Sequence, residues 1–444
     1  MLLALLLFAV GSAICGPASS MNMLIAGRTV QGLGAGAITS SVQIMLSDLV
    51  TLRERGTFSG LMALSWAVGG GVGPVIGGSL AQSGNWCHLL VMMLPSEINN
   101  IYRSEPSDMR VQCDTGSSFH ASEDTICTLK EKLSRMDFIG NILITGSTTS
   151  TVIGLTWGGV QFAWSSASVL VPLIIGLVGL GVFIIYEIYL CKPPVVPILF
   201  RLDWTGISGY LQQFIMAMVL ASLSYWYVIF FEACKDKSPT GAGVDIFGLS
   251  YSISLIAIVA GVVVKKTGKY LIPTYVGWVL MVIGAGLLTT IEVDTTIAKS
   301  VGFQLVIGSG IGTIYVASIF PILASIPVTQ TAPAMALYVF SRNFGQGVEI
   351  AYATIPIIPS LQEPFKDQVR DMFGEALEVV WQVVLGITFV GFLCSLGIRQ
   401  YHLHTNIDEN WGRQDMPVDR WSSPNLEPSG QLSRDLCSGD AEAI

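Results

Sequence analysis

Charged residues are scarce in this chain, and their scarcity sets the class of protein. Only 12% of the 444 residues are Asp, Glu, Lys or Arg, whereas a soluble domain usually carries about 25%. The hydrophobic share is 51% and the mean hydropathy is +0.62. These values exclude both a soluble globular enzyme and a disordered chain. The remaining class is a polytopic membrane protein.

Several motifs that carry chemistry are also missing. The eight cysteines and four histidines form no CxxC pair and no cluster with metal-ligand spacing. No Asn-x-Ser/Thr glycosylation site occurs. There is no phosphate-binding GKS or GKT loop and no nucleophile elbow, so ATP-driven transport and hydrolysis lack support. The net charge of −8 argues against nucleic-acid binding. We therefore expect no enzyme activity, no metal and no cofactor.

About eleven apolar segments are long enough to cross a hydrocarbon core of roughly 30 Å as helices. Because they lack the alternation of a β-strand, they predict an all-α polytopic membrane protein, a helical bundle of about 11–12 transmembrane helices. The first segment is read as a span because it lacks the basic start of a signal peptide. The segments are 1–19, 24–46, 58–82, 137–159, 168–191, 205–233, 245–264, 270–291, 301–326, 332–358 and 377–398.

Polar stretches divide the chain. Residues 84–136 form a polar insert or loop, within which 86–104 could hide a twelfth span, and 401–444 form an acidic tail that we expect to be disordered and cytoplasmic. We expect an incomplete N-terminal transmembrane bundle over 1–200 and a C-terminal one over 201–400. Arg53 and Arg55 place the loop after the second span in the cytoplasm. The basic residues beyond 136 are almost evenly split between the two sides.

The second span carries a charge and several glycines in the pattern Leu24-x-x-x-Arg28-x-x-Gln31-Gly32-x-Gly34-Ala35-Gly36. An unpaired guanidinium within a membrane is costly. Arg28 is therefore expected to face a water-filled cavity or a partner, or else to snorkel to the nearby interface. Gly32 and Gly36 lie four residues apart, which favours close packing against another helix.

The third span contains glycines on both sides of a proline, in the pattern Gly69-x-x-x-Gly73-Pro74-x-x-Gly77-Gly78. A proline removes one backbone hydrogen bond from a helix, and glycines let a neighbouring backbone approach closely. The pattern predicts a kinked and tightly packed helix. A packing element without any role in transport would carry the same features.

These two segments, about 40 residues apart, resemble motifs of the major facilitator superfamily, in particular of the fungal fourteen-span drug:proton antiporters. The first is similar to the family's fourth-helix motif, whose arginine is linked to proton transfer. This implies a proton relay at Arg28 and Gln31. The second is similar to the fifth-helix antiporter motif, which is associated with exporters. The resemblance implies a major facilitator-type bundle.

Three further stretches are similar to the same family. The stretch from Asp48 to Gly56 is similar to the cytoplasmic loop between those two helices. The stretch from Phe231 to Asp245, which includes Ser238-Pro239, is similar to the loop after the ninth helix. The stretch Lys266-Thr267-Gly268-Lys269-Tyr270 is similar to the C-terminal counterpart of the basic loop that gates the cytoplasmic side. It implies a cytoplasmic gating loop made by Lys265, Lys266, Gly268 and Lys269.

The chain also departs from the family pattern. If the second span is the family's fourth helix, the first two helices and their basic loop are absent, so the resemblance implies an N-terminally truncated chain. The sixth helix would begin with a Trp-Arg-Trp-like string. Here the sequence reads Asn85-Trp86-Cys87-His88 and then becomes polar, which suggests an unspliced intron near 87–128.

Polar and aromatic residues in the later spans are candidates for a substrate path. Arg342 and Glu349 lie seven residues apart, two turns along one helix face. Glu349 could accept a proton, bind a cationic substrate or pair with Arg342. Asp137 and Glu187 lie near span ends, where solvation at the interface would explain them. The other candidates are Gln212 and Gln213, which could line a cavity, and Tyr225 and Trp226, which could stack a flat ligand or form an interfacial aromatic belt.

Together the residues and the resemblance predict a proton-coupled secondary transporter that exports amphipathic organic compounds or drugs. Its partners would be the lipid bilayer, a small organic substrate and protons, and its residence the plasma membrane rather than the vacuole. Two alternatives stay open. One is an importer of siderophores or sugars, against which the antiporter-like motif argues. The other is a non-transporting truncated membrane remnant, which the missing helices favour.

Overall fold

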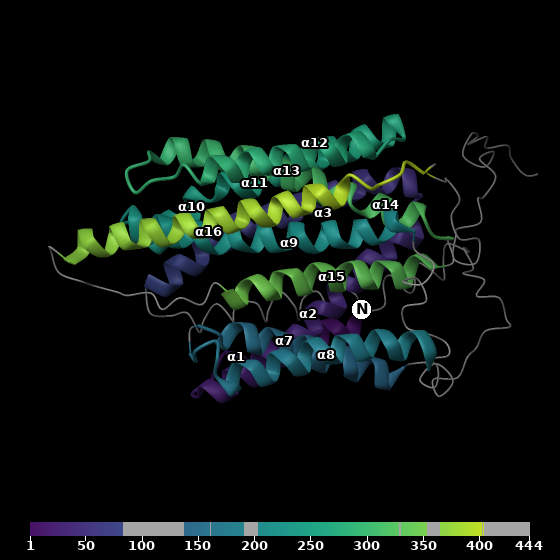
Figure 1. The fold of residues 1–444 in the computed structure, drawn as a ribbon, viewed down its shortest axis with the longest axis horizontal. Coiled ribbons are helices and arrows are strands. Elements are labelled where there is room, and N and C mark those ends of the chain that lie inside the picture. The colour runs from purple at the N-terminus through teal and green to yellow at the C-terminus, as the bar shows by residue number, and fades with distance from the viewer. Residues whose placement is uncertain are drawn as a thin grey trace, which may run out of the picture.

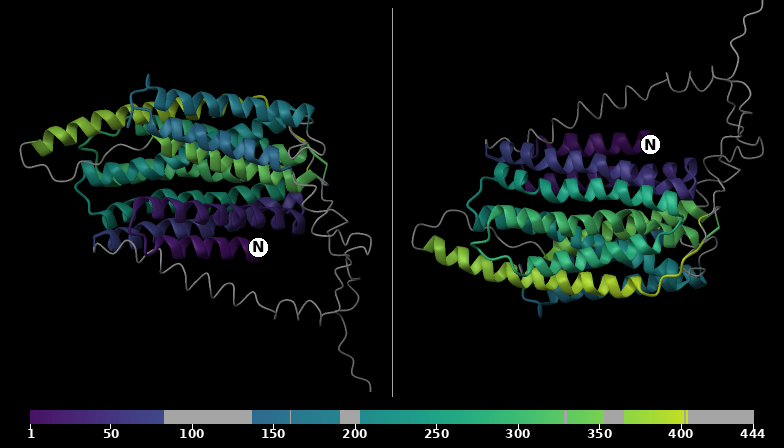
Figure 2. Two further views of the ribbon diagram at one scale, coloured as in Figure 1. Left: turned by 90° about the horizontal axis from the view of Figure 1, so that it is seen from below. Right: turned by 90° about the horizontal axis from the view of Figure 1, so that it is seen from above.

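The computed structural model describes residues 1–82, 137–159, 161–190, 203–327, 330–352, 365–401 and 403. This part of the chain is almost entirely helical, and its long helices run along one common axis (Figure 1, Figure 2). The described residues form no β-strand. The prediction of a helical bundle is confirmed.

Eight helical segments of the described chain are long and apolar enough to cross a membrane. Each range expected from the sequence contains a helix, but α1, with 14 residues, and the helices α2 and α15 are not among these eight. The elements are α1 (Leu2–Cys15), α2 (Met21–Leu49), α3 (Leu52–Gln82), α7 (Phe138–Trp157), α8 (Ala167–Tyr189), α9 (Trp204–Ile229), the π-helix η2 (Phe230–Cys234), α10 (Pro239–Asp245), α11 (Phe247–Thr267), α12 (Leu271–Leu288), α13 (Ile297–Ala317), α14 (Ile319–Ala324), α15 (Thr331–Tyr352) and α16 (Phe365–Ser395).

The helices are arranged on either side of α15. Helix α1 packs on α2 and α7 packs on α8, and the two pairs reach α15 through α2 and α7. On its other side α15 packs on α9, which lies within the bundle that α11, α12, α13 and α16 complete (Figure 1). Helix α3 packs mainly on α11. One helix from the N-terminal part of the chain therefore packs against helices from its C-terminal part.

Buried hydrophobic side chains concentrate in the C-terminal helices. Trp278, Trp381, Tyr227 and Phe320 are all fully buried there. Helix α8, by contrast, exposes apolar side chains around most of its circumference. A helix that is apolar on its exposed faces is suited to contact with lipid rather than water.

Close helix packing in α2 uses glycines other than those expected. Among the described residues, a Cβ atom at Gly32 or Gly36 would meet nothing within 4 Å. A Cβ at Gly34 would instead overlap the backbone of Phe8, and one at Gly27 would lie 2.6 Å from Cys15 Sγ. The prediction for Gly32 and Gly36 was wrong because α1 docks on the face of α2 that carries residues 27, 31 and 34.

Some predictions concern residues that are not described. The polar insert 84–136 with its possible span at 86–104, the end of the expected span 332–358, and nearly all of the tail 401–444 lie outside the described residues. Their organisation stays a prediction, as does the division of the chain near residue 200.

Candidate functional site

A chain of hydrogen bonds around Arg28 links α2 to α1. Arg28 Nη1 donates to Gln31 Oε1 at 3.0 Å, and Gln31 Nε2 donates to Ser12 Oγ at 2.9 Å. Ser12 Oγ in turn donates to the carbonyl oxygen of Phe8 at 3.0 Å. Gln31 and Ser12 are buried, whereas Arg28 is exposed on the bundle surface. The structure therefore brings Arg28 and Gln31 together and gives the guanidinium a neutral amide partner.

The glycines of the antiporter-like motif lie along one side of α3. Gly69, Gly73 and Gly77 are spaced by four residues, and a Cβ at any of them would meet nothing within 4 Å. The expected close approach of another backbone therefore does not occur at these three glycines within the described part of the chain. Pro74 and Gly78 belong to the same continuous helix, but their surroundings are not described.

The close approach of α3 to another helix occurs nearer to its start. A Cβ at Gly261 of α11 would overlap the carbonyl group of Gly56, and one at Gly60 would lie 2.8 Å from the Cα of Ile258. The two backbones touch at this crossing. Glycine is required here because no side chain fits between them.

Polar contacts join α3 to the end of α11 at one end of the bundle. Arg53 Nε donates to the carbonyl oxygen of Lys265 at 2.9 Å, and Lys265 Nζ lies 2.9 Å from Glu54 Oε1. We call these three residues the α3–α11 latch. Lys266 and Lys269, the other lysines of the expected gating loop, are exposed.

The expected gating loop is held in place by the segment after α16. Gly268 ends α11 with a φ of 68°, a conformation that favours glycine. Its carbonyl oxygen accepts from Gln400 Nε2 at 3.3 Å, and the Tyr270 hydroxyl donates to the carbonyl oxygen of Arg399 at 2.6 Å. Burial raises the pKa of Tyr270 to about 12, so this hydroxyl keeps its proton and remains a donor.

Gln212 and Gln213 tie helices together rather than line an open cavity. Both side chains are fully buried. Gln212 accepts a hydrogen bond from Trp278 Nε1 at 2.8 Å and donates to Ser208 Oγ at 3.0 Å. Gln213 Oε1 accepts from Ser318 Oγ at 2.9 Å. Their place in a substrate path is therefore not supported by the geometry.

Tyr225 and Trp226 lie in different surroundings on α9. Tyr225 is 46% exposed, whereas Trp226 is 4% exposed and belongs to the core. The next aromatic residue, Tyr227, stacks on Phe231 with ring centroids 5.9 Å apart. This cluster therefore packs within the protein, and the two candidates do not form one stacking site.

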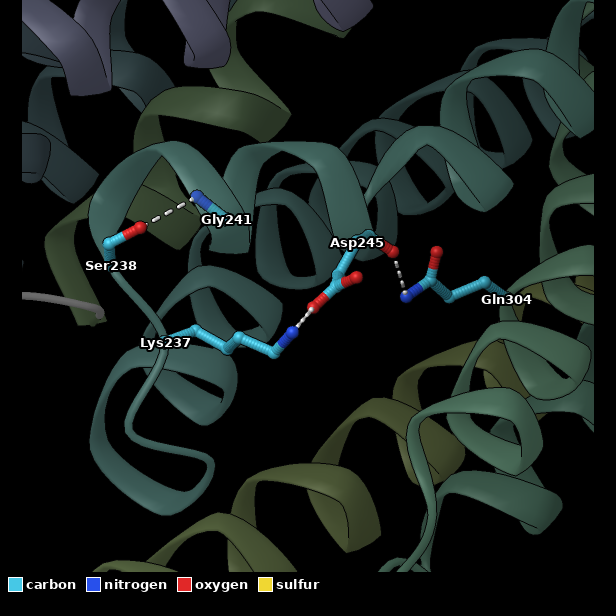
Figure 3. A network of polar contacts seen from close by, with 5 residues as sticks. All are labelled: Lys237, Ser238, Gly241, Asp245 and Gln304. Carbon is cyan, nitrogen blue, oxygen red and sulfur yellow. Dashed lines mark hydrogen bonds and ion pairs between the residues drawn. The ribbon is translucent and has the colours of Figure 1, made fainter.

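The segment after α9 forms a capped corner (Figure 3). Ser238 Oγ accepts from the backbone N–H of Gly241 at 3.2 Å and caps α10, and Lys237 Nζ lies 3.6 Å from Asp245 Oδ2. Gln304 of α13 donates to the carbonyl oxygen of Asp245 at 3.0 Å. The stretch that resembles the family's loop after the ninth helix thus fixes the entry of α11 against α13.

Arg342 lies buried between two aromatic rings. Its Cζ atom is 4.8 Å from the ring centroid of Trp66 in α3 and 5.1 Å from that of Tyr315 in α13, and Nη1 donates to the Tyr315 hydroxyl at 3.2 Å. Stacking on aromatic faces stabilises a partly desolvated guanidinium. Arg342 therefore links α15 to α3 and α13.

The three acidic residues singled out in the sequence lie in different surroundings. Glu349 belongs to α15, but its side chain is not described, so its pairing with Arg342 stays a prediction. Asp137 caps α7 by accepting from the Gly140 N–H at 2.9 Å, and it also accepts from the Tyr186 hydroxyl at 3.0 Å. Glu187 is only 2% exposed. The prediction that Glu187 is solvated at the interface was wrong.

A cavity of about 490 Å³ lies between α2, α7 and α15. Its volume falls in the usual range of roughly 300–1,000 Å³ for small-molecule sites. The described lining is mostly apolar, contains several hydroxyl groups and one amide, and includes no charged side chain. The lining residues are Gly36, Ser40, Thr148, Thr149, Val152, Ile153, Ala336, Val339, Phe340, Asn343, Phe344 and Gly347.

This cavity was not predicted from the sequence. Its walls come from segments more than 100 residues apart, and none of the substrate-path candidates is among its lining residues. One usable signal was present in the sequence. Thr148 and Thr149 lie in the polar run Ser147–Thr151 near the middle of an expected span, where polar side chains often mark a functional surface.

Comparison with known sequences shows which proteins this chain resembles. Residues 1–188 match the family model described as Major Facilitator Superfamily. The chain is 31% identical to the efflux pump FUS6 of Gibberella fujikuroi over 98% of its own length and 82% of the relative. It is 32% identical to the acurin A biosynthesis cluster MFS-type transporter of Aspergillus aculeatus over 93% of its own length and 79% of the relative.

A solved structure shares the same fold. The crystal structure of the human organic anion transporter MFSD10 aligns with a TM-score of 0.52, covering 89% of this chain and 76% of that one. The sequence identity is 12%, so the likeness concerns the fold alone.

Proposed function

Because this chain belongs to the major facilitator superfamily, we propose that it is a proton-coupled exporter of amphipathic organic compounds. The family and its efflux-pump relatives make the chain a multi-pass membrane transporter of the efflux type. Proton coupling, the class of compound and residence in the plasma membrane are the proposed parts.

The cavity between α2, α7 and α15 is the observation that carries the proposal. It lies where N-terminal helices face a C-terminal one. In alternating access, the substrate site lies at such a boundary, and the two groups of helices rock around it. An apolar cavity with a few polar groups is suited to an amphipathic compound.

In this proposal the α3–α11 latch closes the cytoplasmic end of the bundle. Arg53 and Glu54 belong to the N-terminal helices and Lys265 to the C-terminal ones. Contacts that exist in only one of two conformations bias the equilibrium between them. The latch therefore favours the conformation whose cavity is open to the opposite side.

The Arg28 chain is the proposed link to protons. The Arg28 guanidinium donates to the side-chain amide of Gln31, which is buried. Its positive charge and that amide stabilise a proton-carrying group or water beside α2. A water-accessible charge connected to a buried network is a common arrangement for such relays.

An efflux assay with the uncharged dye Nile red tests the proposal. The full chain is expressed in yeast cells that lack their major drug pumps, and the cells are loaded with dye while they are depleted of energy. After glucose is restored, we expect dye to leave faster than from cells without the protein. A protonophore should abolish the difference.

Two results would count against the proposal. Efflux that persists with the protonophore would remove proton coupling. Dye loss equal to that of control cells, with the protein present in the plasma membrane, would favour the non-transporting alternative.

The latch leads to a first prediction. Replacing Glu54 by glutamine removes an ion pair whose side chains are almost half exposed, and such pairs contribute about 0.2–1 kcal/mol. We expect the conformation open to the cytoplasm to become roughly two- to fivefold more populated. The rate at which a cytoplasmic thiol reagent labels a Ser40→Cys variant, in a background free of other cysteines, measures this population.

Lys266→Met is the matched control, because Lys266 is exposed and takes no part in the latch. The exchanged pair Glu54→Lys with Lys265→Glu should return labelling toward the original rate. Equal labelling of the Glu54→Gln and parent proteins would show that the ion pair does not hold this end closed.

A further inference from the structure

The α7–α8 hairpin supplies one wall of the cavity, although it joins the N-terminal helices to the C-terminal ones. Thr148, Thr149, Val152 and Ile153 of α7 face the cavity. On the opposite wall, a Cβ at Gly347 of α15 would lie 3.7 Å from Val152 Cγ2. The hairpin would therefore directly contact any molecule bound in the cavity.

The cavity face of α7 is fixed by the packing of α8. A Cβ at Gly154 would lie 2.8 Å from the backbone nitrogen of Leu173 in α8, and the buried Thr151 packs against Gly176. Ser150 Oγ also donates to the carbonyl oxygen of Pro172 at 2.8 Å. Helix α7 cannot rotate without breaking these contacts, so the polar groups in the cavity keep their positions.

One polar side chain from each wall is available to a ligand. Ser40 of α2, Thr149 of α7 and Asn343 of α15 line the cavity, and within the described part of the chain their side chains make no hydrogen bond. Thr148 differs, because its hydroxyl already donates to the carbonyl oxygen of Ile144 at 2.8 Å. The cavity is thus lined by three side-chain hydrogen-bond donors, one from each of three helices, that make no hydrogen bond within the described part of the chain.

The remaining lining favours a flat apolar body without a charge. Phe340 and Phe344 of α15 stack at 5.9 Å between ring centroids, with an interplanar angle of 19°. A charged ligand would lose its hydration without gaining a counter-ion, because no described lining residue is charged. The guanidinium of Arg342, the neighbour of Asn343, is held between Trp66 and Tyr315. Its charge further disfavours a cation.

We propose that α7 is a specificity-determining wall of the transport cavity, and that Thr149 donates a hydrogen bond to a carbonyl or ether oxygen of an uncharged, planar, amphipathic compound. This inference rests on the proposed efflux function, since it names the compound class and a residue that selects it. Asn343 and Ser40 supply the other donors, and the Phe340 and Phe344 rings contact the apolar body.

Equilibrium binding tests the inference without requiring transport. The full chain is placed in lipid nanodiscs and titrated with Nile red, which is uncharged, planar and carries a carbonyl oxygen. Nile blue has the same ring system with a cationic nitrogen in place of that oxygen. The saturable fluorescence change, after subtraction of protein-free nanodiscs, gives the dissociation constant.

We expect Nile red to bind at least roughly tenfold more tightly than Nile blue, because the cation would be desolvated without a partner. Thr149→Val should weaken Nile red binding roughly three- to tenfold, the effect of one lost hydrogen bond. Thr149→Ser, which keeps the hydroxyl, should restore binding. Thr156→Val, in the same helix but outside the cavity lining, should change binding less than about twofold.

Three results would overturn the inference: no saturable binding of Nile red to the wild-type chain, Nile blue binding as tightly as Nile red, or Thr149→Val binding like the wild type. Failure of the function itself has a different signature. If binding follows the expected pattern but energised cells do not export the dye, the site stands and the efflux proposal fails. If cells export the dye but Thr149→Val binds and transports normally, the function stands and this site fails.

Discussion

Replacing Arg28 by alanine is expected to lower the rate of energised Nile red efflux by roughly 10- to 100-fold, since a hydrogen bond to a charged group contributes about 1.5–3 kcal/mol. The substitution removes both the charge and the bond to Gln31, which is the first link of the chain to Ser12 of α1. The efflux rate in intact cells, normalised to the amount of protein in the membrane, measures the effect.

The binding of Nile red separates a coupling role from a role in the cavity. Arg28 is not among the described lining residues, so the dissociation constant in nanodiscs should stay within about twofold of the wild type. Arg28→Lys, which keeps the charge but not the planar fork of donors, should retain part of the efflux. Efflux by Arg28→Ala at the parent rate would remove Arg28 from the mechanism.

Replacing Gly261 by valine is expected to have the largest effect on folding. A side chain at Gly261 would overlap the carbonyl group of Gly56, and both atoms belong to helix backbones that cannot move aside locally. Overpacking of this kind costs about 3 kcal/mol, a large part of the 5–15 kcal/mol by which a domain is usually stable. We expect a lower melting temperature and a smaller monodisperse peak in detergent for a fluorescently tagged chain.

Gly286→Val is the matched control for this prediction. Gly286 also lies in a C-terminal helix, but a Cβ there would meet no atom of the described chain within 4 Å. The melting temperature of this variant should therefore stay close to that of the parent. If Gly261→Val melts at the parent temperature, the backbones of α3 and α11 do not touch at this crossing.

The sequence is sufficient to predict the long helices of the described chain. Apolar length alone located them, because a segment that crosses a bilayer must be apolar over its whole length and must satisfy its backbone hydrogen bonds internally. The limits of α11 show what local patterns cannot predict. Its expected span began at 245, whereas the chain forms the separate helix α10 up to Asp245 and then a corner held by Gln304.

The packing face of a helix depends on its neighbour and was less predictable. Gly32 and Gly36 have the spacing of a packing motif, yet α1 docks against Gly27 and Gly34. The same spacing occurs on several faces of a glycine-rich helix. Only the position of the partner decides which face is used, and that position depends on the whole bundle.

Within the candidate site, only contacts between residues that are close in the sequence were predictable. Arg28 and Gln31 are three residues apart, so their contact follows from helix geometry. The partner of Gln212, by contrast, is Trp278 on another helix. The cavity requires α2, α7 and α15 to meet, and no local pattern predicts the meeting of three segments that are so distant in sequence.

The tight pairing of α7 with α8 has a consequence for how such transporters diverge. The two helices of the hairpin pack closely at their glycines, and α7 presents one face to the cavity. The hydrogen-bond chain of Arg28 and the α3–α11 latch lie in other helices. Under the proposed mechanism, mutations at Thr149 or Val152 would therefore change which compound is exported and leave the proposed coupling residues untouched. After gene duplication, a few substitutions in this single hairpin would be enough to give one copy a new cargo.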